Sequence, residues 1–221
     1  MLASIPLPKD IVRPPETVLV NITPQETRVA VLEENSICEL HIERNSGHGL
    51  VGNIYLGIVR RVLPGMQSAF IDIGLERAAF LHIVDLLEQR QNPDETQRIE
   101  HMLFEGQTVL VQVIKDPINT KGARLSTQIS LAGRFLVHLP QEDHIGISQR
   151  IEDDAERNSL RERLNNLLPE NACHGYIIRT NAENASDAQL QSDINYLTKV
   201  WEHIQKQAKI QPPETLLYQD L

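Results

Sequence analysis

Five short apolar segments, separated by glycine and proline turns, constrain the fold of this chain more than any other feature. Each has the length and apolar character of a β-strand, and they cover residues 53–63, 67–74, 77–86, 107–116 and 123–132. The turn signals between them are Pro64-Gly65, Gly74, Gly106 and the run from Pro117 to Gly122. Five strands with short turns and one insertion at about 87–105 predict a five-stranded Greek-key OB barrel. A β-sandwich is the main alternative.

The segments on either side of this barrel predict further strands and two helices. They are a strand at 17–22, a hairpin at 27–43 that turns at 34–36, strands at 133–140 and 174–180, and helices at 153–170 and 186–210. The second helix begins with a capping box at Ser186 and Gln189. Its apolar face is formed by Leu190, Ile194, Leu197, Trp201 and Ile204. The fold class is therefore α+β with a β-barrel, and the strand-like end from Glu214 suggests a shortened chain.

The composition is that of a globular protein, with 41% hydrophobic and 23% charged residues. No apolar run reaches the ~18 residues of a membrane-spanning helix. Residues 1–16 are broken by prolines and predict a flexible leader instead of a secretion signal. Cys38 and Cys173 lie far apart and have no CxxC neighbour. We therefore expect neither a zinc site nor a disulfide framework, and a cytoplasmic location.

The net charge of −9 argues against non-specific binding of nucleic acid, because proteins that bind it in this way are usually basic. The acids are unevenly spread, however. Residues 117–136 contain Lys121, Arg124 and Arg134 and no acid at all. A local positive patch can therefore exist on an acidic chain.

Two phenylalanines on neighbouring predicted strands are candidates for base stacking, which OB folds use to bind single strands. In the 67–74 strand, Ile71 and Ile73 share the all-aliphatic face, which leaves Phe70 on the outer face beside Asp72. Phe80 lies on the next strand, and Lys121, in a loop with glycine, is a candidate phosphate contact. The alternatives are an aromatic residue buried in the barrel and a lysine that is only solvated.

The stretch HGYIIRTNAE, at residues 174–183, ends an apolar strand with Arg179 and Thr180 side by side. A guanidinium can clamp a phosphate through two parallel N–H bonds, and a hydroxyl adds a donor. A surface arginine paired with a nearby glutamate is the alternative. Arg150 is similar, but the acids that follow it favour a local salt bridge.

The motifs of known catalytic sites are missing from the sequence. It has no GxGxxG, GxxxxGK[ST], GxSxG or HExxH, and its eight histidines are dispersed. The acidic run at 152–154 is better explained as a helix N-terminus. These residues favour binding over catalysis.

Several long blocks of the chain resemble the ribonuclease E/G family, in order and at family-like spacing. They are VNITPQETRVAV, HIERNSGHGLVGNIYLGIVRRVLPGMQSAFIDIGLERAAFLH, VQVIKDPINTKGARLSTQISLAGRFLVHLP, GISQRIEDDAER and GYIIRTNAE. The resemblance covers about residues 17–221. It implies that 17–48 begin an RNase H-like subdomain, that 49–127 form an S-one-type RNA-binding domain of the OB fold, and that 128–221 form a 5′-sensor domain.

The resemblance also implies roles for single residues. Those expected to contact RNA are Phe70, Phe80 and Lys121. Those expected to hold a 5′-phosphate are Gly133 and Val137 through the backbone, and Arg179, Thr180 and Arg150 through their side chains. Gln149 stands where ribonuclease E has the first arginine of a basic pair, so we expect a weaker charge near this site.

The family cuts single-stranded RNA with a preference for a 5′-monophosphate, and acts in ribosomal RNA processing and RNA turnover in the bacterial cytoplasm. Its Mg²⁺-binding aspartates, on a DNase I-like domain, and its dimerisation region come later than the residues matched here. We therefore expect no catalytic residue, metal site or cofactor in this chain, RNA with a 5′-monophosphate as its partner, and a homodimer of the longer protein. The alternative function is an OB-fold module that contacts protein and has no role with RNA.

Overall fold

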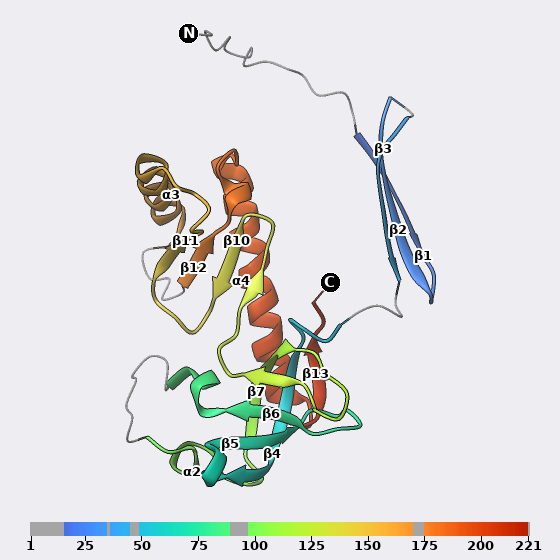
Figure 1. Cartoon of the computed structure of the whole chain (residues 1–221). Coiled ribbons are helices and arrows are strands. Elements are labelled where there is room, and N and C mark those ends of the chain that lie inside the picture. Colours follow the sequence, from blue (N-terminus) through green and yellow to red (C-terminus); the bar gives the residue numbers. More distant parts are fainter. Residues whose placement is uncertain (1–15, 35, 45–48, 89–96, 170–174, 221) are drawn as a thin grey trace. The chain divides into compact units, whose positions relative to one another are not determined.

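The computed structural model describes residues 16–34, 36–44, 49–88, 97–169 and 175–220, so the predicted leader lies outside the described residues, Glu16 excepted. Two compact units are present, one up to Gly49 and one from Leu50 onwards. The first unit is an antiparallel sheet of β1 (Glu16–Ile22), β2 (Glu26–Glu33) and β3 (Ser36–Arg44), in that order. The predicted strand and hairpin are confirmed (Figure 1).

The second unit contains a closed five-stranded barrel. Its strands are β4 (Ile54–Leu63), β5 (Ser68–Asp72), β6 (Ala79–His82), β7 (Thr108–Lys115) and β8 (Arg124–Ser126). They pair in the order β4-β5-β6-β8-β7, and β7 returns to pair with β4. The β6–β8 pair is parallel, and the other pairs are antiparallel. This closure confirms the OB-type barrel and excludes the sandwich.

The connections of the barrel differ in part from the prediction. The 77–86 strand stops at His82, whose Nδ1 accepts from the Val84 amide and starts the 3-10 helix η3 (Ile83–Asp85). A second 3-10 helix, η2 (Pro64–Met66), joins β4 to β5. The short helix α2 (Ile99–Met102) lies within the insertion, of which 89–96 lie outside the described residues. The strand predicted at the end of the chain is β13 (Thr215–Tyr218), which pairs with β4.

A second sheet follows the barrel in the chain. The segment predicted as one strand at 123–132 is two strands, because β9 (Leu131–Ala132) leaves the barrel and joins this sheet. The sheet has the order β11-β12-β10-β9, with β10 (Leu136–Leu139), β11 (Ile145–Ile147) and β12 (Gly175–Ile178). β11 was not predicted, and it runs parallel to β12.

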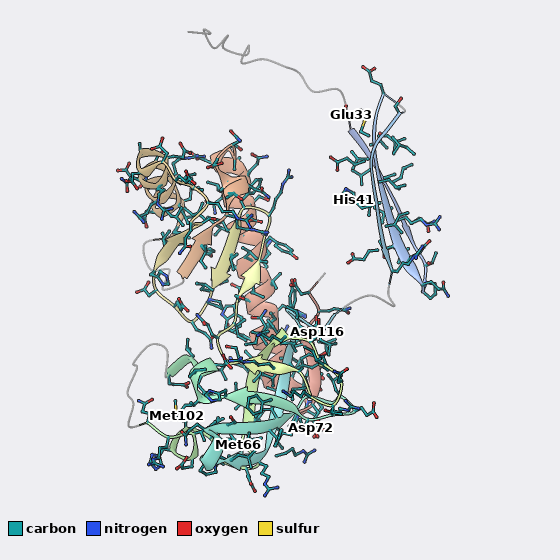
Figure 2. All side chains as sticks on the ribbon, in the orientation of Figure 1. Glu33, His41, Met66, Asp72, Met102 and Asp116 are labelled. Atoms are coloured by element: carbon teal, nitrogen blue, oxygen red, sulfur yellow. The ribbon has the colours of Figure 1, made fainter. Side chains whose placement is uncertain are left out.

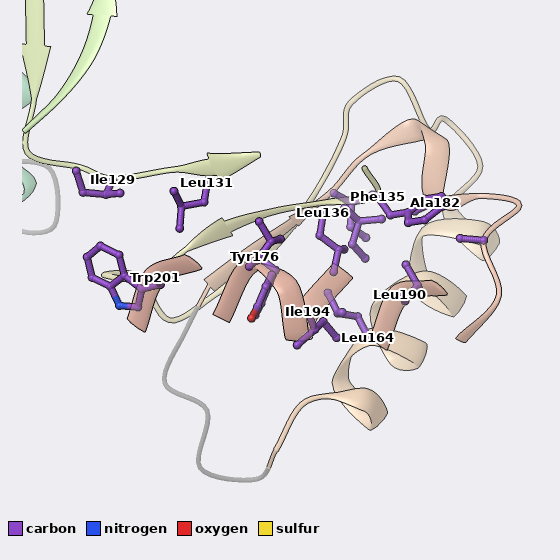
Figure 3. Packing of buried hydrophobic residues seen from close by; sticks show 14 of the residues in the cluster. Ile129, Leu131, Phe135, Leu136, Leu164, Tyr176, Ala182, Leu190, Ile194 and Trp201 are labelled. Atoms are coloured by element: carbon purple, nitrogen blue, oxygen red, sulfur yellow. The ribbon is translucent and has the colours of Figure 1, made fainter. Parts of the chain in front are cut away.

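Two helices build a hydrophobic core with this sheet. They are α3 (Asp154–Leu167) and α4 (Asp187–Ile210), and α4 starts with the predicted capping box at Ser186. All five residues of the predicted apolar face of α4 are buried. They pack with residues of the sheet such as Leu136 and Tyr176 (Figure 3). α4 contacts β9 and β10 as well as β13, so one helix braces both the sheet and the strand added to the barrel.

Gln112 joins the barrel to the second sheet through a buried set of hydrogen bonds. Its Nε2 donates to the carbonyls of Gly52 and Ser130, both at 2.8 Å, and its Oε1 accepts from the Ser130 amide at 2.8 Å. The side chain is 5% exposed, so water cannot replace these partners. The chain is therefore fixed at the point where it leaves the barrel.

We expect Gln112→Ala to lower the free energy of unfolding by about 1–3 kcal/mol, because it leaves polar backbone groups of the half-buried Gly52 and Ser130 without these partners. Urea titration followed by circular dichroism measures the change. The matched control is Gln205→Ala, at an exposed position of α4, which should change stability little. Equal effects of both substitutions would contradict this account.

Candidate functional site

A groove of about 830 Å³ runs along the outer face of β5, β6 and β8. The residues that line it are Met66, Phe70, Arg77, Ala78, Phe80, Lys115, Asp116, Ile118, Thr120, Lys121, Gly122 and Arg124. Figure 2 labels two of them, Met66 and Asp116, on the barrel. All three residues expected to contact RNA line this groove, so the fold brings them together from two strands and one loop.

The two phenylalanines lie opposite each other on adjacent strands. Phe70 of β5 pairs with Phe80 of β6, and their ring centroids are 6.2 Å apart with an edge-to-face geometry. Phe70 is 37% exposed whereas Ile71 is fully buried, which confirms that Phe70 points out of the barrel. Phe80 is half-buried. Together the rings form an apolar surface on which a planar group can stack.

Lys121 lines the same groove and lies in a tight turn. The backbone groups of Ile118 and Lys121 bond each other in both directions, at 2.9 and 3.1 Å. Gly122 then passes so close to β6 that a Cβ there would lie 2.0 Å from the Ala78 carbonyl oxygen. The ammonium of Lys121 is exposed and makes no ion pair among the described residues. It is therefore free to meet an anion in the groove.

Other cations line the same groove: Arg124, which the acid-free segment contains, and Arg77 and Lys115, which the sequence reasoning did not single out. Arg124 donates two hydrogen bonds to the Asp85 carboxylate, at 2.8 and 3.1 Å, and this bonding raises the pKa of the guanidinium above its ordinary value. Arg77 donates to the Asn119 carbonyl, and Lys115 ends β7. Asp116 is the one acid among the lining residues. The groove is thus locally positive on an acidic chain, as the acid-free segment predicted.

Arg179 and Thr180 lie where β12 ends and the 3-10 helix η4 (Thr180–Ala182) begins. The Arg179 amide donates to the Phe135 carbonyl at 2.9 Å, and its guanidinium Nη1 donates to the Gly133 carbonyl. Its side chain is exposed, and Thr180 is half-buried. The arginine is therefore oriented by a backbone carbonyl, and further N–H groups remain for a ligand, because a guanidinium has five.

The backbone of Gly133 and Val137, the two positions expected to contact the phosphate, already takes part in pairing within the sheet. The Gly133 amide donates to the Leu136 carbonyl at 2.7 Å. Val137 lies in β10, opposite Ile177 of β12 on one side and Ala132 of β9 on the other. A phosphate contact with either amide would have to share a hydrogen bond of the sheet. These two contacts stay a prediction.

Gln149 and Arg150 form a turn directly after β11. β11 is parallel to β12, with Ile147 opposite Ile178, so this turn and Arg179 leave the same end of the sheet. Arg150 is exposed, and the local salt bridge favoured by its acidic neighbours is not formed among the described residues. Its cationic side chain is therefore at the edge that carries Arg179 and Thr180.

Asp193 of α4 is a residue near this site that the sequence reasoning missed. Its carboxylate accepts hydrogen bonds from the amides of Arg134, Phe135 and Leu136, at 3.2, 2.9 and 2.9 Å. In the sequence it follows two other polar residues of a helix, Gln191 and Ser192, and nothing there signals that it bonds a loop 58 residues away.

The structure also bears on metals and membranes. Among the residues that it describes, no group of three or more His, Cys, Asp or Glu side chains is placed to hold a metal ion. None of the described helices is long and apolar enough to span a membrane.

Comparison with known proteins gives consistent matches. The model of the ribonuclease E/G family matches residues 130–221. Ribonuclease G of Haemophilus influenzae is 44% identical over 207 residues, which are 90% of this chain and 42% of that protein. Ribonuclease G of Escherichia coli K12 is 45% identical over 210 residues, 92% of this chain and 42% of that protein. Ribonuclease E of the same strain is 38% identical over 209 residues, 91% of this chain and 19% of that protein.

The chain thus spans less than half the length of the ribonuclease G relatives that it matches. The match nevertheless extends over nine-tenths of the chain, so it includes the barrel and the second sheet together. The closed barrel, the α+β fold and the identities with these relatives agree. The chain belongs to the ribonuclease E/G family.

Proposed function

We propose that this chain binds single-stranded RNA and holds its 5′-monophosphate end, as the RNA-binding and 5′-sensing region of an endoribonuclease. The observation that supports this most is the groove in which Phe70, Phe80 and Lys121 converge. An apolar, aromatic surface with cations around it has the two features by which proteins bind single strands without reading their sequence. The names of the relatives, ribonuclease G and ribonuclease E, point to RNA as the ligand.

In this proposal bases stack on Phe70 and Phe80, and Lys121 neutralises a phosphate of the backbone. Stacking tolerates every base because each has a π-face. Lys115 and Arg77 add positive charge along the groove. The chain can therefore bind RNA even though its net charge is −9, because the charge that matters is local.

The terminal phosphate is held by Arg179 and Thr180 at the end of β12. The guanidinium, held by the Gly133 carbonyl, offers its remaining N–H groups, and the Thr180 hydroxyl offers another donor. Arg150 adds positive charge at the same edge of the sheet. A triphosphate is too large and too charged for a site built around one phosphate, so the site selects a 5′-monophosphate.

RNA cleavage belongs in this proposal to the longer protein, in ribosomal RNA processing and RNA turnover. This chain selects and positions the RNA, and no step of hydrolysis is assigned to its residues. The competing function is a barrel that contacts protein, which the acidic net charge favours. The two functions differ in how binding of an unstructured RNA depends on salt.

We expect the chain to bind a fluorescent single-stranded oligoribonucleotide with an affinity that falls steeply as the NaCl concentration rises. Lysine and arginine side chains that bind phosphates displace the counterions of the RNA, and added salt opposes this release. Fluorescence anisotropy at several salt concentrations measures this. Lys121→Ala should weaken binding and lower the salt slope by about 1. The matched control is Lys206→Ala, at an exposed position of α4. If no RNA binds even at low salt, the RNA-binding function is contradicted and the protein-contact function is favoured.

A further inference from the structure

The loop that follows β9 is held by a carboxylate of this same chain. Asp193 accepts hydrogen bonds from three consecutive amides, those of Arg134, Phe135 and Leu136. The side chain is half-buried and forms no ion pair among the described residues. Its negative charge is therefore balanced by amide dipoles, an arrangement that binds anions in many proteins.

The same loop orients Arg179. The residue before the three amides is Gly133, whose carbonyl accepts from the Arg179 guanidinium. Asp193 also packs against Gly133, since a Cβ there would lie 2.6 Å from Oδ2 of the carboxylate. The loop is thus held by an acid of α4, and the Gly133 carbonyl in the same loop accepts a hydrogen bond from Arg179.

We propose that Asp193 is a positioning residue for recognition of the 5′-phosphate. It binds the amides of 134–136 and so fixes the Gly133 carbonyl, which in turn sets the direction of the Arg179 guanidinium. The carboxylate already takes the amides of 134–136, so these three amides are not available to the phosphate, and the side chains of Arg179 and Thr180 hold it. This inference rests on the proposed function of the site.

The test is Asp193→Asn, which keeps the size of the side chain and removes its charge. One oxygen remains as an acceptor, but the new NH₂ group is a donor and faces amide donors. We expect affinity for a 5′-monophosphorylated oligonucleotide to fall about tenfold, because the loop loses charge-assisted hydrogen bonds. Affinity for the same oligonucleotide with a 5′-hydroxyl should not change.

Two further variants separate positioning from a general loss of structure. Asp193→Asn combined with Arg179→Ala should bind the 5′-monophosphate no more weakly than Arg179→Ala alone, because Asp193 acts through that arginine. In Gly133→Ala the new Cβ would displace the Asp193 carboxylate. This variant, like Asp193→Asn, should lose the preference for a 5′-monophosphate over a 5′-hydroxyl. The control is Glu202→Gln, which removes one charge at an exposed position of the same helix.

The outcomes distinguish this inference from the function on which it rests. An unmodified chain with no preference for a 5′-monophosphate would overturn the sensing function and this inference together. If Arg179→Ala abolishes the preference while Asp193→Asn and Gly133→Ala retain it, only the role of Asp193 is overturned. That role would also be overturned if the double variant lost as much affinity for the 5′-monophosphorylated oligonucleotide as the two single variants lose together.

Discussion

Arg179→Ala is expected to weaken binding of a 5′-monophosphorylated oligoribonucleotide by about 10- to 100-fold and to weaken binding of the 5′-hydroxyl form only slightly. The guanidinium would supply the charge-assisted hydrogen bonds to the terminal phosphate, and such bonds contribute about 1.5–3 kcal/mol. The arginine is exposed, and the contact that its side chain loses inside the protein is the one to Gly133. Removal of the Arg179 side chain should therefore lower the affinity for the ligand more than the stability of the fold.

Anisotropy titrations with two oligonucleotides that differ only at the 5′ end measure this effect. Arg161→Ala is the matched control, because Arg161 is an exposed arginine of α3 to which no contact with RNA is assigned. This substitution should lower the affinity for both oligonucleotides slightly and equally, because it removes one positive charge. A loss of equal size for both ligands in Arg179→Ala would contradict the sensing function.

Phe70→Ala is expected to weaken binding of an unstructured oligoribonucleotide by about 1–3 kcal/mol, the contribution of one stacked base. The effect should be the same with either 5′ end, since the groove is separate from the end of β12. Phe70 is 37% exposed, so we expect its truncation to affect stability less than binding. Phe80 is half-buried, and its truncation should affect both.

The control for Phe70 is Phe104→Ala, since Phe104 is 67% exposed and does not line the groove. Both truncations remove an exposed aromatic ring, and only one should change RNA affinity. A thermal melt of each variant shows whether the fold is kept. Unchanged affinity of Phe70→Ala would mean that RNA does not stack on this face of the barrel.

Local patterns in the sequence predicted the elements whose residues bury a regular face. The apolar face of α4 and the outward direction of Phe70 both follow from periodicity, and both are confirmed. The barrel followed from strand lengths and turn residues because its neighbouring strands are mostly close in the chain. Such features depend on residues a few positions apart, which a sequence displays directly.

Features that depend on distant partners were not predictable in this way. β11 has three residues, too few to show a period, and it exists because it pairs with β12. The break between β8 and β9 coincides with the bonds from Gln112 to Ser130, across 18 residues. Asp193 bonds a loop 57–59 residues away. Polar side chains that satisfy distant backbone groups leave no local signal in the sequence.

The most direct test of the central claim is a crystal structure of this chain with a short 5′-monophosphorylated oligoribonucleotide. We expect the terminal phosphate within hydrogen-bonding distance, about 2.7–2.9 Å, of the Arg179 guanidinium, with the Thr180 hydroxyl as a second donor. Bases should stack on Phe70 and Phe80. A phosphate bound elsewhere, with Arg179 still bonded to Gly133 alone, would contradict the account.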